Sequence, residues 1–506
     1  MATIRIDLEY PRFPVERKIF GHFTEHAFGN IYGGMYDPES KLADEDGLRT
    51  DVLELMRRVR VPLLRYPGGN FVSNYHWENG VGPKESRPRV FEYAWLTEES
   101  NQFGTVEFIK LCRKVGAEPL ICVNMGSGTP EEAMHWVEYC NGTGDTYYAN
   151  LRRSHGYEEP FGVKYWGLGN EMYGNWQMQN LTAEEYARYA FQFAKAIRWA
   201  DPTVKLIACG LQDSTDWNTA CMKLIGPMCD YISAHHYSIG WGPFEKGDYL
   251  GCLYIPELME RMHQMTLASI TVGMNDVTNH CKVAWDEWNM FGWVFDGVND
   301  DESYTLQDSI VTALVLHRLL NNSDTVGMAN YSTFVNINGA VSVHGDQVVT
   351  RAQYPVFELL ANHTGDEVLD VRMTGPKLSV PYRKTGDMGR KPLGLSLTSA
   401  EAGAPDTVEV PALDVLATRG TDGTIYLSIV NKSPDEDITA DISLPGLDLA
   451  GKTVTAKVIT AEDINAANTL AHPDRVAIAD ADAPAVTARG LAATFGRHSV
   501  NLITIS

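Results

Sequence analysis

Two glutamates lie in short motifs that directly follow segments with the composition of buried strands. Glu171 ends Gly167-Leu-Gly-Asn-Glu171, and Glu287 lies in Asp286-Glu-Trp-Asn289. Cleavage of a glycosidic bond with retention of configuration requires two carboxylates about 5 Å apart, one as the acid and one as the nucleophile. We therefore predict that these two residues form such a pair. Taken singly, Glu171 could instead open a surface helix, and Glu287 could belong to a structural ion pair.

The nucleophile of this pair needs hydrogen-bond donors. Glu287 lies between Trp285 and Trp288, and an ionised carboxylate in such apolar surroundings is unstable without donors. We predict that Arg65 and Tyr237 supply them, because each follows or ends another strand candidate.

The acid of the pair, Glu171, needs surroundings that raise its pKa above that of an ordinary carboxyl group. The preceding Asn170 could hold a sugar hydroxyl beside the reacting carbon. Asn70 follows the turn Pro67-Gly68-Gly69, whose glycines let a ligand approach the backbone closely. Glu25, after the first strand candidate, could either bind sugar hydroxyls or form a salt bridge.

Two adjacent histidines, His235 and His236, could suggest a metal site. Adjacent residues of a strand face opposite sides, however, and neither an HExxH motif nor a matching carboxylate and histidine cluster accompanies them. We therefore predict no metal at these histidines, and we expect His235 to orient a carboxylate of the site.

Several tryptophans fall in candidate loops, where an aromatic face could stack on a sugar ring. Because the chain has eleven tryptophans, some of these must belong to the core instead. The candidates are Trp77, Trp176, Trp241 and Trp293.

Elements that position these residues can be recognised between about residues 16 and 364, where β-branched runs alternate with amphipathic helical stretches. This alternation predicts an α/β fold, a (β/α)₈ TIM barrel whose catalytic groups lie at the carboxyl ends of its strands. A capping box, Thr182-Ala-Glu-Glu185, predicts a helix that continues through Trp199. The eight strand candidates are Ile19–Phe23, Val61–Tyr66, Pro119–Val123, Val163–Leu168, Val204–Ala208, Tyr231–Ala234, Val283–Trp285 and Thr325–Asn330.

From residue 365 to 506 the pattern changes to short alternating strands separated by Gly, Pro and Asp. This pattern predicts a C-terminal all-β sandwich or jelly-roll domain. The N-terminal strand Thr3–Leu8 has the same character, so residues 1–15 are expected to complete that domain. The other candidates are Leu378–Tyr382, Val408–Val410, Thr424–Val430, Ile438–Ile442, Thr453–Ile459 and Val500–Ile505.

Composition limits the partners and the location of this chain of 506 residues. Its net charge of −23 repels nucleic acid and anionic membrane surfaces, so a neutral substrate is expected. The first residues lack the apolar segment of a signal peptide, and no later stretch could span a bilayer, which predicts a cytoplasmic protein. Eight cysteines without a CxxC pair predict free buried thiols.

Together these motifs resemble those of the family 51 glycoside hydrolases, the α-L-arabinofuranosidases, over nearly the whole chain. The resemblance rests on the two glutamate motifs and on further segments, namely Ile31-Tyr-Gly-Gly34, Arg65-Tyr-Pro-Gly-Gly-Asn70, Gly80-Val-Gly-Pro83 and Asp463-Ile-Asn-Ala-Ala-Asn-Thr469.

The resemblance implies a role for each site residue. Glu171 would protonate the glycosidic oxygen of an arabinose-containing oligosaccharide, and Glu287 would form a covalent arabinosyl-enzyme, after which Glu171 would activate water. The furanose hydroxyls would be bound by Glu25, Asn70 and Asn170, with Tyr237 near the nucleophile. The resemblance also implies no cofactor and a homo-oligomer, frequently a hexamer.

One position departs from the pattern of that family. Many members carry a substrate-contacting Gln a few residues before a Tyr-Pro pair, whereas alignment on Tyr354-Pro355 places Thr350 there, with Gln353 in a different register. Loss of one hydrogen bond to a sugar hydroxyl can change the preference among furanoses.

Three alternatives stay open at this point. The first is a β-D-galactofuranosidase, β-xylosidase or endo-β-glucanase with the same mechanism. The second is a non-catalytic carbohydrate-binding protein, and the third is a metal-dependent barrel enzyme, which shares the fold without the chemistry.

Overall fold

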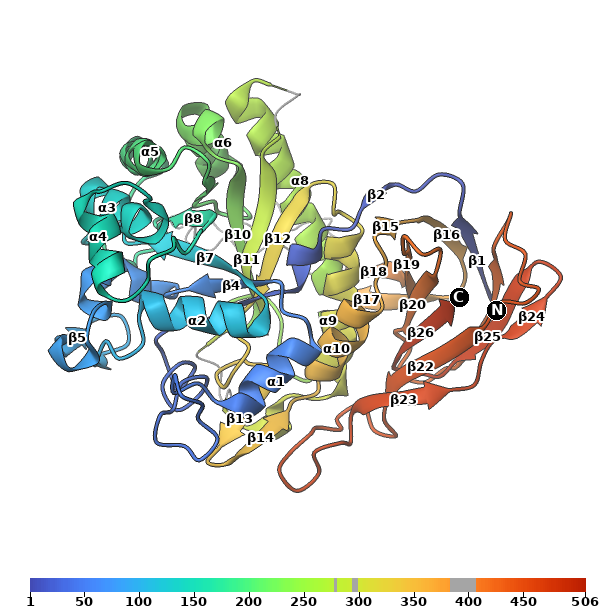
Figure 1. Ribbon diagram of the computed structural model, residues 1–506. Coiled ribbons are helices and arrows are strands. Elements are labelled where there is room, and N and C mark those ends of the chain that lie inside the picture. Colours follow the sequence, from blue (N-terminus) through green and yellow to red (C-terminus); the bar gives the residue numbers. More distant parts are fainter. Residues whose placement is uncertain (277–279, 294–298, 383–405) are drawn as a thin grey trace.

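The computed structural model describes residues 1–276, 280–293, 299–382 and 406–506. Eight parallel strands close into a barrel in the order β10-β11-β12-β3-β4-β7-β8-β9 (Figure 1). The predicted (β/α)₈ barrel is therefore confirmed. The strands are β3 (Gly21–Phe23), β4 (Leu63–Tyr66), β7 (Glu118–Val123), β8 (Tyr165–Leu168), β9 (Lys205–Ala208), β10 (Tyr231–Ile239), β11 (Lys282–Phe291) and β12 (Val326–Tyr331).

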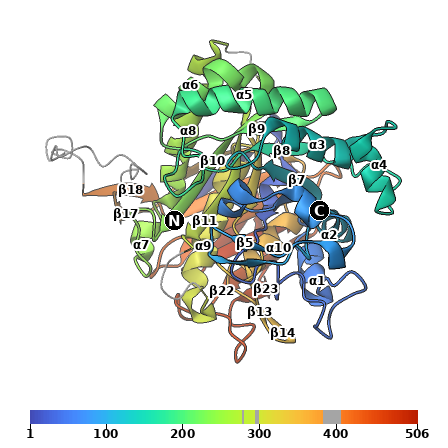
Figure 2. The same cartoon turned by 90° about the vertical axis from the view of Figure 1, so that its left-hand side faces the viewer.

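Helices surround the barrel on its outer side, as Figure 2 shows. The predicted capping box is confirmed: the Thr182 and Glu185 side chains cap one another's backbone at the start of α5 (Ala183–Ala200). The other helices are α1 (Thr50–Arg58), α2 (Thr105–Val115), α3 (Pro130–Asn141), α4 (Tyr147–Ser154), α6 (Thr215–Ile225), α7 (Tyr249–Cys252), α8 (Ile255–Met274), α9 (Leu306–Leu320) and α10 (Tyr354–Asn362).

Three of the expected strand bounds are wrong. Ile19 belongs to a 3-10 helix, Arg17–Phe20, that leads into β3. β10 and β11 continue well beyond the predicted ends, so that His235 and Glu287 lie within strands rather than after them. The hydrophobic sequence pattern of β10 and β11 stops before the strands end, because polar side chains of their last residues fill the mouth of the barrel. Both strands also have register shifts, which are irregularities that bend a strand.

The barrel interior and the barrel mouth differ in chemistry. Near the amino-terminal ends of the strands the interior is filled by a small buried cluster: Leu63, Leu120, Tyr165, Ile207, Ala284 and Met328. Such a layer is a packed core and not a channel. Polar groups are consequently confined to the opposite end, where the strands carry the residues considered below.

The second part of the chain is a β-sandwich beside the barrel, separated from its strands by α9 and α10 (Figure 1). All six predicted C-terminal strands have counterparts in the structure. The first sheet contains β16 (Asp370–Thr374), β1 (Ala2–Asp7), β21 (Ile438–Ser443), β25 (Gly490–Phe495) and β24 (Ala485–Thr487) in that order. The second contains β2 (Phe13–Pro14), β15 (Glu367–Val368), β19 (Leu413–Arg419), β20 (Ile425–Asn431), β26 (Ser499–Ile505), β22 (Val454–Thr460) and β23 (Ala477–Ala481).

Three hairpins complete the fold, and β1 ties the N-terminus to the sandwich by pairing with β16 and β21. We propose that the chain divides near residue 365, with residues 1–15 contributing to the second domain. The hairpins are β5 (Val90–Glu92) with β6 (Thr97–Glu99), β13 (Val341–His344) with β14 (Gln347–Thr350), and β17 (Lys377–Pro381) with β18 (Thr407–Pro411).

Two predictions from composition can be compared with this fold. All eight cysteines are free, and all but Cys281 are fully buried, which confirms the predicted buried thiols. In the part of the chain that the structure describes, no helix combines the length and the apolar character needed to cross a membrane.

Candidate active site

A pocket of about 540 Å³ opens at the carboxyl ends of the barrel strands. Both predicted catalytic glutamates line it, together with two of the predicted sugar-binding residues and several tryptophans. Its lining residues are Glu25, Asn70, Trp95, Glu171, Trp176, Gly240, Trp241, Glu287 and Trp293. Position, size and composition are those of a small-molecule site in this type of barrel.

Glu287 is held by the two donors expected for it. Arg65 Nη1 lies 2.7 Å from Glu287 Oε2, and the Tyr237 hydroxyl donates to Oε1 at 2.6 Å. The same hydroxyl lies 2.8 Å from the Ser332 hydroxyl. Because β10 and β11 run side by side, His235 and Glu287 are register partners. The two donors fix the carboxylate and offset the cost of burying its charge.

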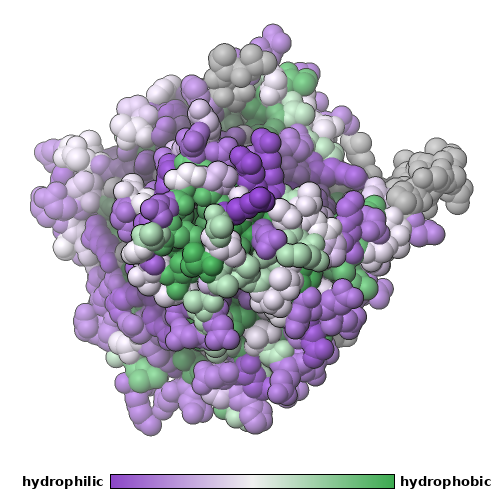
Figure 3. Space-filling model, turned by 90° about the vertical axis from the view of Figure 1, so that its right-hand side faces the viewer, coloured by the Kyte–Doolittle hydropathy of each residue, from purple (hydrophilic) through white to green (hydrophobic). Residues whose placement is uncertain are grey.

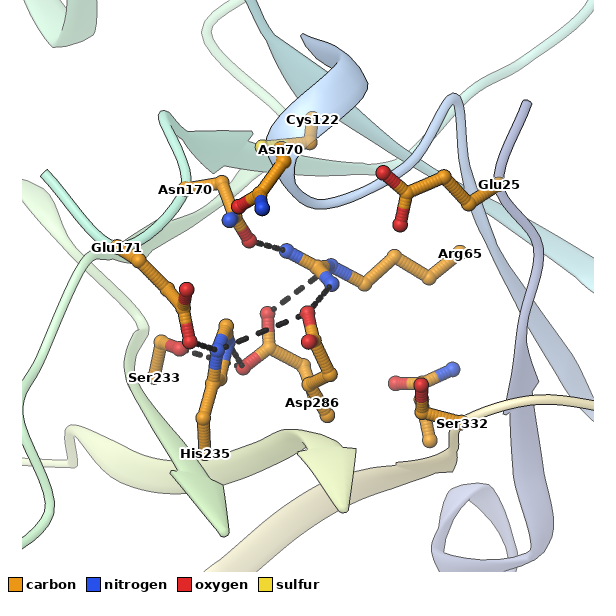
Figure 4. Close-up of polar contacts among 12 residues, drawn as sticks. Glu25, Arg65, Asn70, Cys122, Asn170, Glu171, Ser233, His235, Asp286 and Ser332 are labelled. Carbon is orange, nitrogen blue, oxygen red and sulfur yellow. Dashed lines mark hydrogen bonds and ion pairs between the residues drawn. The ribbon is translucent and has the colours of Figure 1, made fainter. Parts of the chain in front are cut away.

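Glu171 lines the same pocket as Glu287, and Figure 4 shows its carboxyl group directed toward His235. Its backbone has φ +44°, a left-handed conformation that is strained for a residue with a side chain and is typical of functional positions. The Trp176 indole N–H donates to Oε2 at 2.8 Å, and His235 Nδ1 lies 3.0 Å from Oε1. The Glu171 carboxyl group is thereby aimed into the pocket.

The expectation of a raised pKa for Glu171 is wrong for the unliganded site. Burial raises its pKa, but the hydrogen bond with His235 and the charge of that ring outweigh burial, and the pKa of Glu171 falls below its ordinary value. Burial alone would lower the pKa of His235, yet the charge of Glu287 and the hydrogen bonds with Asp286 and Glu171 raise it to about 10. The Glu171–His235 pair therefore holds one proton, and it is on the imidazole before substrate enters.

Asp286 supports this arrangement from below. Its Oδ1 lies 3.4 Å from His235 Nε2 and accepts a hydrogen bond from the Ser233 hydroxyl, and its Oδ2 lies 3.3 Å from Arg65 Nε. The cations His235 and Arg65 thus lie among the carboxylates of Glu171, Asp286 and Glu287, and Figure 4 shows the first two of these beside His235. Sequence reasoning did not single out Asp286, although its place directly before Glu287 could have suggested it.

The sequence predicts no cluster of carboxylates around His235, but the structure brings two carboxylates close to its ring. One oxygen of Glu171, one of Glu287 and a ring nitrogen of His235 all lie within 4.8 Å of one another, close enough for a metal ion. Arg65 already binds the Glu287 oxygen, and a protonated His235 cannot ligate. A metal would have to displace both cations, so the absence of a metal stays our prediction, and treatment with a chelator tests it.

Glu25 lies on the opposite side of the pocket from Glu171. Its Oε1 accepts hydrogen bonds from the Phe71 backbone N–H at 3.0 Å and from the Trp95 indole at 2.9 Å. Gly68 has φ +153°, and a Cβ there would lie 2.4 Å from Glu25 Cγ, so a side chain at this turn would displace Glu25. Burial and the nearby charge of Glu287 raise the pKa of Glu25 to about 7.

We predict that Glu25→Gln stabilises the protein at pH 8 but not at pH 5. The folded protein keeps the Glu25 proton up to about pH 7, whereas an ordinary glutamate loses it near 4.5. The Glu25 proton therefore stabilises the folded protein below pH 4.5, and this stabilisation is lost as the pH rises to 7. The resulting change in the free energy of unfolding is about 3 kcal/mol. Thermal unfolding of both proteins at the two pH values measures it, with Glu85→Gln at an exposed position as the control. An equal change at both pH values would contradict the prediction.

The two asparagines lie beside the catalytic pair. Asn170 Oδ1 accepts a hydrogen bond from Arg65 Nη2 at 2.7 Å, while its buried Nδ2 has no hydrogen-bond partner within the described residues. Asn70 Oδ1 accepts from Gln177 Nε2. Each amide is thus fixed through its oxygen, and Asn170 keeps a free donor next to the pocket for a sugar hydroxyl.

Gly69 forms the floor between these groups. A Cβ there would lie 3.2 Å from Glu287 Oε2, 3.3 Å from Asn170 Nδ2 and 3.4 Å from Glu25 Oε2. We predict that Gly69→Ala lowers kcat/KM by about 100-fold with little change in Tm, since a methyl group would shift the sugar relative to the nucleophile. Gly144→Ala, in an exposed loop, is the control. Unchanged activity would mean that no sugar lies over Gly69.

Aromatic side chains form the walls of the pocket. Trp176, Trp241 and Trp293 line it, as three of the four tryptophan predictions require. Trp77 belongs to the core instead, as was expected for some of the four: it is buried and stacks on Trp136 of α3. Sequence reasoning missed Trp95, which stacks on Trp293 at 5.4 Å, because nothing in its local sequence distinguishes it from a loop residue.

The expected position of Thr350 at the sugar-binding site is also wrong. Thr350 ends β14 and lines a separate groove between α1, α10 and β23 of the sandwich. Gln353 is buried at the start of α10 and does not line the pocket of the two glutamates. Alignment on the Tyr-Pro pair therefore selects a position outside this pocket.

Comparisons with known proteins show the family to which this chain is similar. Residues 55–246 match the family model of the α-L-arabinofuranosidase 1 domain, and residues 286–499 match that of the α-L-arabinofuranosidase C-terminal domain. A probable α-L-arabinofuranosidase C of Aspergillus niger is 38% identical over 89% of this chain and 88% of its own. An intracellular exo-α-(1→5)-L-arabinofuranosidase of Bacillus subtilis is 32% identical over 100% of this chain and 99% of its own.

Solved structures show the same relationship. The thermostable GH51 α-L-arabinofuranosidase of Thermotoga petrophila has a TM-score of 0.88 and 38% identity, with both chains covered completely. A Paenibacillus polymyxa xyloglucanase of family 44 shares the fold at a TM-score of 0.63 but only 14% of the sequence. The chain therefore belongs to the family 51 α-L-arabinofuranosidases.

Proposed function

We propose that this protein is a retaining, exo-acting α-L-arabinofuranosidase that uses Glu171 as acid and base and Glu287 as nucleophile. The observation that carries the mechanism is the distance between the two carboxylates, whose nearest oxygens lie within 4.8 Å. Retaining enzymes have carboxyl groups about 5 to 5.5 Å apart, whereas inverting enzymes need about 6.5 to 9.5 Å to admit a water molecule.

In the first step, Glu287 Oε2 or Oε1 attacks the anomeric carbon while Glu171 protonates the departing oxygen. Arg65 and Tyr237 hold the Glu287 carboxylate in position for this attack. The proton must move from His235 to Glu171 before transfer, which the 3.0 Å contact between them permits. As Glu287 attacks, negative charge develops on the departing glycosidic oxygen. The Glu171–His235 pair supplies a proton to that oxygen.

In the second step, Glu171 acts as a base. It takes a proton from water, which attacks the anomeric carbon of the arabinosyl-enzyme and releases Glu287. His235 can accept the proton from Glu171 and return the pair to its starting state. Glu25, Asn70 and Asn170 surround the sugar on the side away from the leaving group and bind its hydroxyls.

Release of a single terminal sugar is supported by the shape of the site, a pocket with tryptophan walls rather than an open cleft. The printed name of the Bacillus subtilis relative, an intracellular exo-α-(1→5)-L-arabinofuranosidase, supports the same mode and also a cytoplasmic location. From that location we infer that the substrates are short imported arabinose-containing oligosaccharides.

We also propose a homo-oligomer, hexameric as the family resemblance implies. Apolar side chains gather near the middle of the sandwich face that Figure 3 shows, within a polar surround. Contiguous apolar surface of this kind is typical of contacts between subunits. Sedimentation of the purified protein at several concentrations tests this proposal, and a monomer at all of them would contradict it.

The function is tested with aryl α-L-arabinofuranoside beside aryl β-D-galactofuranoside, β-D-xyloside and β-D-glucoside. We expect turnover of the arabinofuranoside, with α-arabinofuranose as the first product seen by NMR. Turnover of another sugar alone would keep the mechanism and replace the substrate, which is the first alternative. Initial release of the β anomer would exclude retention. No turnover of any sugar would favour a carbohydrate-binding protein.

A further inference from the structure

A second hollow, of about 270 Å³, lies on the same end of the barrel as the active-site pocket. It is formed by segments that connect β4 with α2: the 3-10 helices η2 (Asn70–Asn74) and η3 (Trp77–Gly80) and the hairpin β5–β6. Its lining residues are Phe71, Asn74, Tyr75, His76, Asn79, Val90, Phe91, Glu92, Tyr93, Glu99 and Asn101.

The two hollows share the same supporting segments. At the start of η2, Asn70 lines the active-site pocket, whereas Phe71 and Asn74 line the second hollow. The segment between β5 and β6 likewise carries Trp95 in the first pocket and Tyr93 in the second. The second hollow is therefore separated from the catalytic pocket only by η2 and this hairpin.

Two aromatic side chains of the second hollow are exposed. Phe91 is 49% and Tyr93 61% accessible, and their ring centroids lie 5.2 Å apart at 71°. Such exposure of two neighbouring rings is costly in water unless a ligand or a partner covers them. An L-shaped pair of rings presents faces on which the C–H surface of a sugar can stack.

The two carboxylates of the second hollow already have hydrogen-bond partners within the protein. Glu92 accepts hydrogen bonds from the backbone N–H groups of Ala94 and Trp95, and Glu99 binds the Tyr32 hydroxyl at 2.5 Å. These carboxylates stabilise the β5–β6 hairpin, and we assign them no contact with a ligand.

Two side-chain amides of the same hollow are free. Neither Asn74 nor Asn79 has a side-chain hydrogen bond among the described residues, and both are partly exposed. Primary amides offer a donor and an acceptor each, which suits the vicinal hydroxyls of a sugar. His76 is paired with Glu132 at 3.0 Å, so no unpaired charge is offered to an ionic ligand.

We propose that this hollow is an accessory subsite for one neutral pentose unit of a longer arabino-oligosaccharide. The proposal rests on the proposed function, which brings such chains to this end of the barrel. Phe91 and Tyr93 stack on the sugar ring, and Asn74 and Asn79 bind its hydroxyls. The subsite increases the affinity for long substrates without contact with the reacting bond.

The test compares wild type with a Phe91→Ala/Tyr93→Ala double variant and with Asn79→Ala. Each is assayed with an aryl α-L-arabinofuranoside, which fills only the catalytic pocket, and with a linear α-1,5-arabino-oligosaccharide of at least six units. Trp199→Ala is the matched control, since Trp199 is 73% exposed near the end of α5, at the opposite end of the barrel.

We expect kcat/KM for the long substrate to fall about tenfold in the double variant, through KM, with the aryl substrate unaffected. Asn79→Ala should show the same selectivity to a smaller degree. Equal loss on both substrates would overturn the proposal, because it would mean that the hairpin only positions Trp95. No loss on the long substrate would also overturn it, as would a change of oligomeric state, which would make the rings a contact between copies. Failure of wild type on the aryl substrate would instead reject the proposed function.

Discussion

Glu287→Gln is expected to lower kcat for every substrate by about 10⁴-fold or more, with little effect on KM or on Tm. The amide keeps the shape of the carboxylate but cannot form a glycosyl-enzyme, and removal of a group that acts only in the chemical step affects kcat directly. Folding should persist because Arg65 retains Asp286 at 3.3 Å and Asn170 at 2.7 Å. Steady-state kinetics with an aryl arabinofuranoside and thermal unfolding measure both effects.

A matched control separates loss of the nucleophile from loss of a buried ion pair. Asp301 is paired with buried Arg351 at 2.8 Å and does not line the active-site pocket. Asp301→Asn should therefore reduce stability and leave kcat per folded molecule unchanged. In Glu287→Ala, azide can attack the anomeric carbon from the vacated side, and the expected product is an arabinosyl azide of inverted configuration. Activity of Glu287→Gln near the wild-type level would reject Glu287 as the nucleophile.

Glu171→Ala is expected to show the second largest effect, and its size should depend on the leaving group. Substrates with a poor leaving group, such as an oligosaccharide, need the proton and should lose about 10²- to 10⁴-fold in kcat/KM. A dinitrophenyl arabinofuranoside leaves without a proton, so its first step should be nearly unaffected while hydrolysis of the intermediate becomes slow. The prediction is a burst of dinitrophenol followed by slow turnover with a low KM.

The same variant tests the second role of Glu171, that of base. Azide needs no base and should restore turnover of the dinitrophenyl substrate, with an arabinosyl azide of retained configuration as the product. The pH dependence gives a further measurement. Wild type should lose activity at high pH as the Glu171–His235 pair gives up its single proton, and the pKa of His235 is about 10. This alkaline limb should be absent in Glu171→Ala with the activated substrate. A uniform loss on all substrates would contradict the assignment.

A large part of the fold could be predicted from the sequence because it depends on local patterns. The alternation of β-branched runs with amphipathic stretches indicated the barrel, and a capping box of four residues set the start of α5. The alternating strands after residue 365 indicated the sandwich. Glu171 and Glu287 could be named because a parallel barrel brings the carboxyl ends of all its strands to one mouth.

The wrong predictions involve contacts between residues far apart in the chain. β10 and β11 extend to Ile239 and Phe291, and the polar residues of these extensions contact groups far away in the sequence. Glu287 of β11, for example, pairs with Arg65, and His235 of β10 contacts Glu171. Trp77 and Trp95 are both tryptophans in the loops after β4, yet one packs in the core and the other holds Glu25. Only the packing of distant segments separates these two roles.

The sequence by itself determined which chemical groups this protein possesses and on which end of the barrel they lie, since strand order and local pattern suffice for that. The tertiary structure decided the distance between the two carboxylates, the residue that holds the catalytic proton, and the position of Thr350 outside the pocket. The physical reason is that pKa values and hydrogen bonds at a buried site depend on every charge within a few ångströms, and those charges come from five different strands and loops of the barrel.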